Sequence, residues 1–261
     1  MTEYKAFALD LAEKAGKIIR ENFSVGMKKE WKSDHSPVTE TDLKINQMVI
    51  EAVQKQFPEH GILSEEESAF DGKSEYVWVC DPVDGTIAFS HAVPTCVFSL
   101  ALVRNGESIL GVVADPFLER MFSAEKGKGA FLNGKKLHVS EQTSLSNAVI
   151  GCGRWKGKTY DLEALTFPLL EEGASVLDLG SVTYMGMLVS SGEFAGNLFQ
   201  GIRPWDMAAL KVIVEEAGGK MTDLFGNEQR YDRDLRGAIA SNGKVHDELV
   251  KMVQKYMKGP K

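Results

Sequence analysis

The chain has 261 residues, 43% of them hydrophobic, which is enough for a substantial core in one large domain or in two halves that share an interface. Its formal net charge is −7, and because a nucleic-acid surface needs clusters of Lys and Arg, this acidic excess argues against a polymeric nucleic acid as partner. No apolar run reaches the ~18 residues of a spanning helix and the first residues lack the layout of a signal peptide, so we expect no membrane partner and a cytoplasmic location.

Two amphipathic helices are predicted near the beginning of the chain. Residues 3–23 place apolar side chains at helical spacing between Glu and Lys residues. A second helix follows the segment PVTET, where Thr41 or Asp42 can cap it, and it ends before Pro58.

A β-rich region comes next, and most of it has the pattern of an antiparallel sheet. Strands are expected at 61–66, 76–82, 96–103 and 108–115. The run at 76–82 is apolar and is stopped by its proline. Arg104-Asn105-Gly106-Glu107 joins the last two strands, and Asn133-Gly134 marks a second tight turn.

From about residue 145 the pattern changes to alternating strands and helices. Strands are expected at 147–153, 174–181, 194–201 and 237–242, and helical segments near 160–172, 182–192, 205–217 and 244–257. This alternation predicts a three-layer α/β half. We therefore expect an α+β half over residues 1–140 and an α/β half over 141–261, with a cleft between them.

Two aspartates flank a tight turn directly after the strand at 76–82. In DPVDGT, Asp81 and Asp84 can point to one place, and neighbouring carboxylates repel unless a cation or a proton lies between them. Oxygen ligands favour magnesium, manganese or calcium over zinc. Gly85 and Thr86 can begin a helix whose N–H groups face an anion. The motif indicates a phosphate site with metals, although such a segment on its own is more often a capped turn.

Other acidic residues have both a functional and a purely structural interpretation. Asp206 lies in the first turn of an apolar helix, where it can serve the helix dipole alone, and Asp42 can be a simple cap. Glu65, Glu66 and Glu67 can be a solvated face.

Two common site types are excluded by spacing and composition. GCGRWKGKT lacks a P-loop's first glycine, because Cys152 stands at that position. The cysteines Cys80, Cys96 and Cys152 contain no C-x-x-C spacing and predict buried free thiols, and the five histidines show no metal-binding pattern.

Five segments, in this order along nearly the whole chain, resemble the inositol monophosphatase family of magnesium-dependent, lithium-sensitive phosphatases. They are PVTETD, ILSEEES, WVCDPVDGT, LGS and RPWDMAA. The resemblance implies a layered αβαβα sandwich of the sugar-phosphatase type, a homodimer, two or three Mg²⁺ ions per site and a small phosphorylated metabolite as substrate.

The resemblance also implies a set of metal ligands. Glu65, Asp81 and the carbonyl of Val83 match the ligands of a first magnesium, and Asp81, Asp84 and Asp206 match those of a second. Two divalent cations can offset the charge of a phosphate monoester, lower the pKa of a water and stabilise the departing oxygen.

Catalytic and supporting roles carry over in the same way. We expect Glu65 and Thr86, the latter hydrogen-bonded to Asp42, to orient the water that attacks phosphorus. The amides of Gly85 and Thr86 would hold phosphate oxygens, and Glu66 would support the site from behind. Glu67 is expected on the surface.

Substrate contacts are expected from Asp84, Asp206 and a segment that matches the family's Gly-Thr-Ala-like sequence. That segment consists of Gly180, Ser181 and Val182. Inositol 1-phosphate is the first candidate substrate. However, inositol-specific members carry a glutamate where this chain has Phe199, and an apolar ring cannot accept hydrogen bonds from ring hydroxyls.

Alternative substrates follow from that difference and from a basic loop. Arg154, Lys156 and Lys158 form either a solvated loop or a contact for a second anionic group at the cleft. The alternatives are histidinol phosphate, fructose 1,6-bisphosphate and a 3'(2'),5'-bisphosphate nucleotide. A different class of function is an inactive family member that acts as a binding or regulatory protein.

Overall fold

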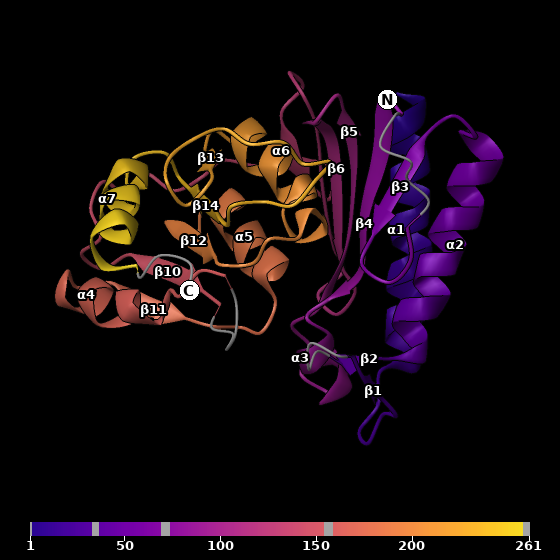
Figure 1. Cartoon of the computed structure of the whole chain (residues 1–261), viewed down its shortest axis with the longest axis horizontal. Coiled ribbons are helices and arrows are strands. Elements are labelled where there is room, and N and C mark those ends of the chain that lie inside the picture. Colours follow the sequence, from indigo (N-terminus) through magenta and orange to yellow (C-terminus); the bar gives the residue numbers. More distant parts are fainter. Residues whose placement is uncertain (1, 33–36, 69–73, 154–158, 258–261) are drawn as a thin grey trace.

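Two β-sheets carry the fold in the computed structural model, which describes residues 2–32, 37–68, 74–153 and 159–257 (Figure 1). The larger sheet has the strand order β3-β4-β5-β6-β7-β8-β9. Its strands are β3 (Gly61–Ser64), β4 (Tyr76–Asp84), β5 (Val97–Arg104), β6 (Glu107–Asp115), β7 (Arg120–Glu125), β8 (Ala130–Leu132) and β9 (Lys135–Lys136). The smaller sheet has the order β11-β10-β12-β14-β13. Its strands are β10 (Val149–Cys152), β11 (Ser175–Leu177), β12 (Gly196–Phe199), β13 (Lys220–Thr222) and β14 (Ala238–Ser241).

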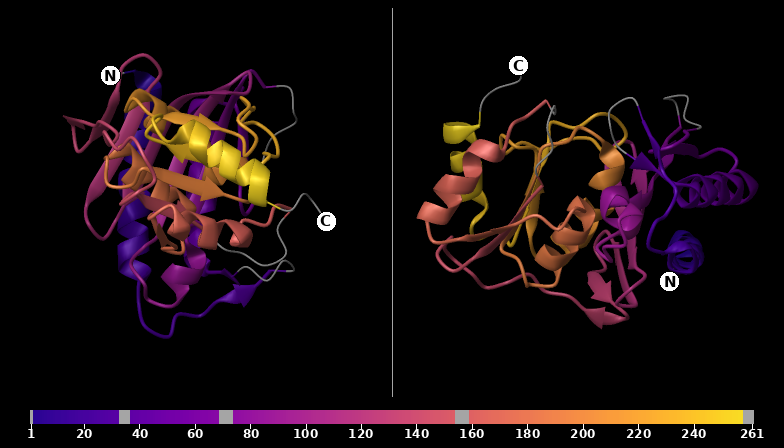
Figure 2. Two further views of the ribbon diagram at one scale, coloured as in Figure 1. Left: turned by 90° about the vertical axis from the view of Figure 1, so that its left-hand side faces the viewer. Right: turned by 90° about the horizontal axis from the view of Figure 1, so that it is seen from below.

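Helices cover and separate these sheets, so that five layers alternate across the molecule (Figures 1 and 2). Helices α1 (Glu3–Asn22) and α2 (Glu40–Gln56) cover the outer face of the larger sheet. Helices α5 (Val182–Ser190) and α6 (Ala208–Glu216) lie between the two sheets. Helices α4 (Thr166–Glu171) and α7 (His246–Tyr256) cover the outer face of the smaller sheet. The predicted αβαβα layering is confirmed.

The first two helices form for local reasons that the sequence shows. Phe7, Leu11 and Ile19 recur on one face of α1 and are buried against the sheet. The second helix begins differently from the prediction. Thr39 is its N-cap, and Asp42 stands at the third helical position, where the two side chains form a capping box. The predicted cap at Thr41 or Asp42 is therefore wrong by two or three residues.

The antiparallel region follows the predicted turns. Strands β5 and β6 pair through the turn at Asn105 and Gly106, both of which have positive φ, as a two-residue hairpin turn requires. Strand β4, in contrast, does not stop at its proline but continues to Asp84. Its register with β5 shifts between Asp81 and Asp84, and this bulge accommodates Pro82 because a bulged residue needs no ladder hydrogen bond.

The second half differs from its prediction in several boundaries. The helix expected near 160–172 consists of a 3-10 turn, η1 (Glu163–Leu165), followed by the short α4. The strand expected at 174–181 is limited to β11. The sequence analysis missed β13 and the small β1 (Glu30–Trp31) and β2 (Pro37–Val38) pair. The division of the chain at residue 140 stays a prediction, although the larger sheet ends at Lys136 and the smaller one begins at Val149.

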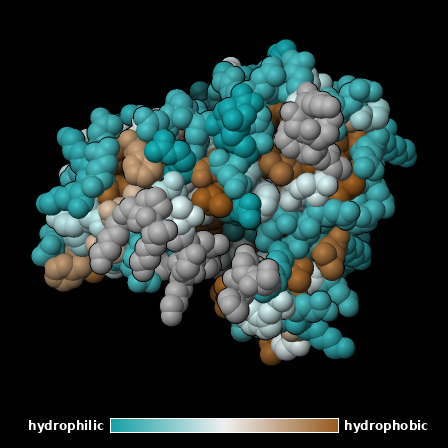
Figure 3. All heavy atoms as spheres, in the orientation of Figure 1, coloured by the Kyte–Doolittle hydropathy of each residue, from teal (hydrophilic) through white to brown (hydrophobic). Residues whose placement is uncertain are grey.

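One face of the protein is largely polar, and its cysteines are buried. The face shown in Figure 3 is mainly hydrophilic, with hydrophobic side chains in small separate groups. Cys80, Cys96 and Cys152 are buried and form no disulfide, as predicted. In the part of the chain that the structure describes, no helix is long and apolar enough to cross a membrane.

Candidate active site

The end of β4 and the turn after it form one wall of a cleft. Asp81 and Asp84 are only 1% and 6% exposed, and Gly85 follows with a φ of 94° at the start of α3 (Thr86–Ser90). A Cβ on Gly85 would lie 2.9 Å from the Cβ of Ser181 and 3.0 Å from the carbonyl oxygen of Thr95. Glycine is required here both for the left-handed backbone and for this close approach to the start of α5.

Three carboxylates from the two halves of the fold meet in this cleft. Asp206 lies at the end of a 3-10 turn, η2 (Pro204–Asp206), and its carboxylate oxygen and those of Asp81 and Asp84 lie within 4.8 Å of one another. Burial raises the pKa of Asp81 well above its ordinary value, and the neighbouring charges of Glu65, Asp84 and Asp206 raise it further. Such a cluster of oxygen donors suits a hard divalent cation, which would offset the repulsion.

The start of α5 fixes the orientation of Asp84. The hydroxyl of Ser181 and the backbone N–H of Thr183 both donate to Asp84 Oδ2, each at 2.6 Å. The hydroxyl of Thr183 donates to the backbone oxygen of Asp206 at 2.8 Å. Because both bonds to Asp84 use the same oxygen, they orient the carboxylate without occupying its other oxygen. Burial nevertheless raises the pKa of Asp84, against the lowering effect of these bonds.

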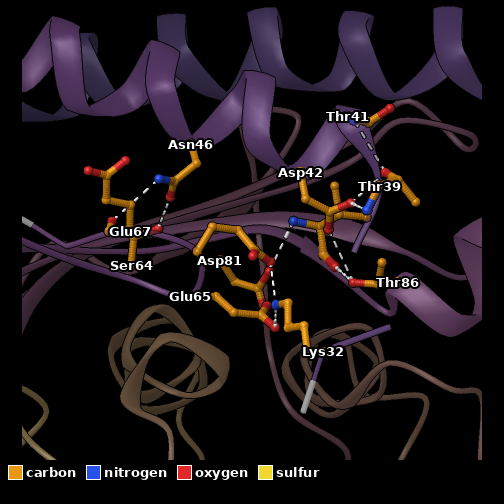
Figure 4. Close-up of polar contacts among 12 residues, drawn as sticks. Lys32, Thr39, Thr41, Asp42, Asn46, Ser64, Glu65, Glu67, Asp81 and Thr86 are labelled. Carbon is orange, nitrogen blue, oxygen red and sulfur yellow. Dashed lines mark hydrogen bonds and ion pairs between the residues drawn. The ribbon is translucent and has the colours of Figure 1, made fainter. Parts of the chain in front are cut away.

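A lysine that the sequence analysis missed binds two of the glutamates, and its contact with Glu65 is drawn in Figure 4. The ammonium group of Lys32 lies 2.9 Å from Glu65 Oε1 and 2.6 Å from Glu66 Oε1. Burial raises the pKa of Glu66 to about 7, although its bond to Lys32 acts in the opposite direction. Glu67 is exposed, as predicted. Nothing in KKEWKS distinguished this lysine from its neighbours, because its partners come from a distant part of the chain.

The predicted contact between Thr86 and Asp42 is present (Figure 4). Thr86 Oγ1 lies 3.2 Å from Asp42 Oδ1 and 2.9 Å from the carbonyl oxygen of Val83, so its single proton is shared between two acceptors. Asp42 is fully buried, and its Oδ2 accepts bonds from both the backbone N–H and the hydroxyl of Thr39. Burial raises the pKa of Asp42 to about 6.

The cleft has a volume of ≈ 370 Å³ and brings most of the predicted site residues together. Those that line it are Glu65, Asp81, Val83, Asp84, Gly85, Thr86, Gly180, Val182 and Asp206. Asp42, Glu66 and Ser181 lie behind this lining and contact it through their hydrogen bonds. The lining also includes Phe199, Ile202, Arg203 and Trp205. The predicted basic loop, Arg154 to Lys158, lies outside the described residues.

Comparison with known proteins places the chain in a family. The sequence profile described as the inositol monophosphatase family matches residues 1–258. The chain belongs to this family. Its members are phosphatases, and the chain, with the family's acidic cluster in its cleft, is a hydrolase of phosphate monoesters.

The chain is also similar to individual members of the inositol monophosphatase family, both in sequence and in structure. A Thermotoga maritima protein described as fructose-1,6-bisphosphatase/inositol-1-monophosphatase is 38% identical over 221 residues, which cover 84% of this chain and 83% of that protein. The solved structure of a Thermotoga maritima IMPase is 35% identical, with a TM-score of 0.88 over 97% of this chain and 98% of that one. An IMPase/NADP phosphatase solved with Mg²⁺ and phosphate is 26% identical, with a TM-score of 0.86 over 98% of each chain.

Proposed function

We propose that the protein is a magnesium-dependent phosphomonoesterase that hydrolyses a small phosphorylated metabolite, with inositol 1-phosphate as the first candidate. The observation that carries the proposal is the meeting of Asp81, Asp84 and Asp206 within 4.8 Å in a cleft. Three buried or half-buried carboxylates this close together repel one another, and divalent cations offset that repulsion. The related IMPase/NADP phosphatase, solved with Mg²⁺ and phosphate, supports the choice of ion and ligand.

The donor set of the cleft fits magnesium, since it consists of oxygen atoms only. The residues that would hold two or three ions are Glu65, Asp81, the carbonyl of Val83, Asp84 and Asp206. When bound, magnesium offsets the charge of the substrate phosphate, lowers the pKa of a water and stabilises the departing oxygen.

The protein's own residues orient the attacking water in this proposal. Thr86 donates its only proton to Asp42 or Val83, so its remaining lone pair can accept a hydrogen bond from water. Glu65 faces the same cleft and accepts a second bond. With both of its protons engaged, the water directs a lone pair towards phosphorus. The amides of Gly85 and Thr86 hold the phosphate oxygens.

A second substrate candidate is fructose 1,6-bisphosphate. Phe199 lines the cleft at the position where inositol-specific relatives carry a glutamate, and this ring offers no acceptor for the hydroxyls of inositol. The Thermotoga relative with both activities in its description supports this candidate. Histidinol phosphate and a 3'(2'),5'-bisphosphate nucleotide belong in the same screen. The homodimer and the cytoplasmic location stay predictions.

The proposal is tested by measuring phosphate release from these four esters with magnesium, with EDTA and with added lithium. We expect hydrolysis that requires magnesium and that lithium inhibits. Asp81→Asn should abolish it while circular dichroism shows an intact fold. If the wild-type protein releases phosphate from none of the esters and calorimetry detects no magnesium binding, the protein is instead an inactive family member with a binding or regulatory role.

A further inference from the structure

One of the cations that line the cleft has no role in the proposed mechanism. Among the described residues that line the cleft, two are cationic: Lys32 and Arg203. Lys32 is engaged by Glu65 and Glu66. Arg203 directly precedes η2, three residues before Asp206, and its side chain is 52% exposed.

The guanidinium of Arg203 is positioned but only weakly held. Its Cζ lies 5.5 Å from the centre of the Trp205 ring, and the indole face limits the directions that the side chain can take. Its Nη1 donates to Asp234 Oδ1 at 3.1 Å, but the Asp234 side chain is 62% exposed. Because solvent screens an ion pair this exposed, an anion bound in the cleft can replace Asp234.

Arg203 has both polar and apolar neighbours: Gln200 lines the same cleft, and Asp234 lines a second cavity that Arg203 also borders. Phe199, Ile202 and Trp205 stand beside Arg203 in the cleft lining. The acidic side chains among the described lining residues are Glu65, Asp81, Asp84 and Asp206, the residues proposed as metal ligands. A guanidinium is a planar fork of donors that matches a phosphate or a carboxylate. This part of the lining therefore suits an alcohol that carries an anionic group better than an uncharged polyol.

We propose that Arg203 binds a second anionic group, a phosphate or a carboxylate, on the alcohol portion of the substrate, and that it sets the enzyme's preference for such esters. Asp234 occupies the guanidinium when that group is missing. The inference rests on the proposed phosphatase function and identifies the class of substrate that the function serves.

Matched pairs of substrates isolate the second anion. Fructose 1,6-bisphosphate is compared with fructose 1-phosphate, adenosine 3',5'-bisphosphate with adenosine 3'-phosphate, and 3-phosphoglycerate with glycerol 3-phosphate. In each pair the first ester carries an additional phosphate or carboxylate. The quantity measured is the ratio of kcat/KM within a pair, which cancels effects on the shared phosphate and on the metals. The three pairs separate a sugar, a nucleotide and a carboxylate as the source of the anion.

The chain provides a closely matched control for Arg203. Arg104 is 53% exposed, its Nε donates to Glu75 at 2.7 Å, and its Cζ lies 5.3 Å from the ring centre of Tyr76. It is thus another exposed arginine with a carboxylate partner and an aromatic neighbour, but it lies at the end of β5 and outside the cleft lining. Arg104→Gln and Glu75→Gln therefore repeat the changes of Arg203→Gln and Asp234→Asn away from the substrate.

We expect the wild-type protein to have the higher kcat/KM for the doubly anionic member of at least one pair. Arg203→Gln should reduce the ratio of kcat/KM within that pair about tenfold, because it removes one charge-assisted contact. Arg203→Lys should give a ratio between those of the wild-type protein and Arg203→Gln. Asp234→Asn should raise the ratio by up to about fivefold, because it removes the competing carboxylate. Arg104→Gln and Glu75→Gln should leave it unchanged.

Two results would overturn the inference: no preference in any pair for the wild-type protein, or an equal loss on both members of a pair in Arg203→Gln. The proposed function is overturned instead if the wild-type protein hydrolyses none of these six esters and neither inositol 1-phosphate nor histidinol phosphate, and binds no magnesium. In that case the same pairs are compared by calorimetric binding, where an unchanged preference in Arg203→Gln still refutes the role of Arg203.

Discussion

Replacing Asp81 by asparagine should change the stability of the folded protein in opposite directions with and without magnesium. Without cations, Asp81 is buried among carboxylates that repel it, so its charge destabilises the folded protein. Asparagine keeps the shape and an oxygen that can accept the bond that the Val83 N–H donates to Asp81 Oδ1 at 3.0 Å. We therefore expect Asp81→Asn to stabilise the protein in EDTA and to destabilise it, relative to the wild type, in magnesium.

The magnitude follows from the distances in the cluster. At 4.8 Å and an effective dielectric constant of about 20, each carboxylate pair repels by about 3 kcal/mol, and Asp81 takes part in a pair with Asp84 and another with Asp206. In the wild-type protein, protonation of the cluster relieves part of this repulsion. Because the folded protein raises the pKa of Asp81 above 3.8, wild-type stability declines as pH rises above that value. At pH 8 in EDTA we expect Asp81→Asn to raise the free energy of unfolding by about 1–3 kcal/mol.

Magnesium should reverse this order. A ligand at a thousandfold excess over its dissociation constant adds about 4.1 kcal/mol to the free energy of unfolding, more than the advantage of about 1–3 kcal/mol expected for Asp81→Asn in EDTA. The wild-type protein should gain this amount, and Asp81→Asn should gain much less because it lacks the shared ligand. Urea unfolding at pH 8, with EDTA and with magnesium, measures both differences.

A second buried aspartate serves as the control. Asp115 is 2% exposed, but its Oδ2 lies 2.7 Å from Arg120 Nη2, so its charge is paired. Asp115→Asn should lower the free energy of unfolding under both conditions, since Arg120 loses its partner. The reasoning is refuted if Asp81→Asn behaves like Asp115→Asn in EDTA, or if magnesium stabilises Asp81→Asn as much as the wild-type protein.

Two further substitutions test the surroundings of the site, and a third tests a buried histidine of α7, outside the cleft lining. Ser181→Ala removes one of the two bonds that orient Asp84, and calorimetry should show magnesium affinity about tenfold lower. Thr86→Ala should reduce kcat more than magnesium affinity, and Thr86→Ser should restore part of kcat; equal effects on both would reject its role with the water. Burial lowers the pKa of His246 from 6.5 to about 4, so the unfolded chain takes up the proton first and stability falls as pH drops from 6.5 to 4, by up to about 3 kcal/mol. Urea unfolding should show a flatter pH dependence for His246→Gln.

Sequence patterns were sufficient to predict the elements that depend mainly on residues close to one another in the chain. The apolar stripe of α1 and the Asn105-Gly106 turn were predicted correctly, because helix periodicity and turn chemistry depend on neighbouring residues. The start of α2 was predicted two or three residues too late, at Thr41 or Asp42, because several side chains of PVTETD can cap a helix. Thr39 takes this position while Asp42 closes the capping box with one oxygen and contacts Thr86 with the other, a contact between distant segments.

The site was predictable to the extent that its residues lie in recognisable motifs. DPVDGT suggested a cation site by itself, but only the resemblance brought Asp206 to it, because no spacing rule relates two segments so far apart. Lys32 and Arg203 were missed as site residues. Lys32 is one of three lysines in KKEWKS, and its glutamate partners come from a distant segment of the chain. Arg203 begins the motif RPWDMAA, but the resemblance assigned a role there only to Asp206.

The helix α5 explains how two halves with separate sheets can maintain one metal site. Its first residues bind Asp84 through Ser181 and Thr183, and the Thr183 hydroxyl also binds the backbone of Asp206. Asp84 at the end of β4 and Asp206 at the end of η2, two of the proposed metal ligands, are therefore bound to the same turn of helix. Gly85 allows this turn to approach, since a Cβ there would meet Ser181 at 2.9 Å. The spacing of the carboxylates thus depends on how the first turn of α5 packs against β4 and η2.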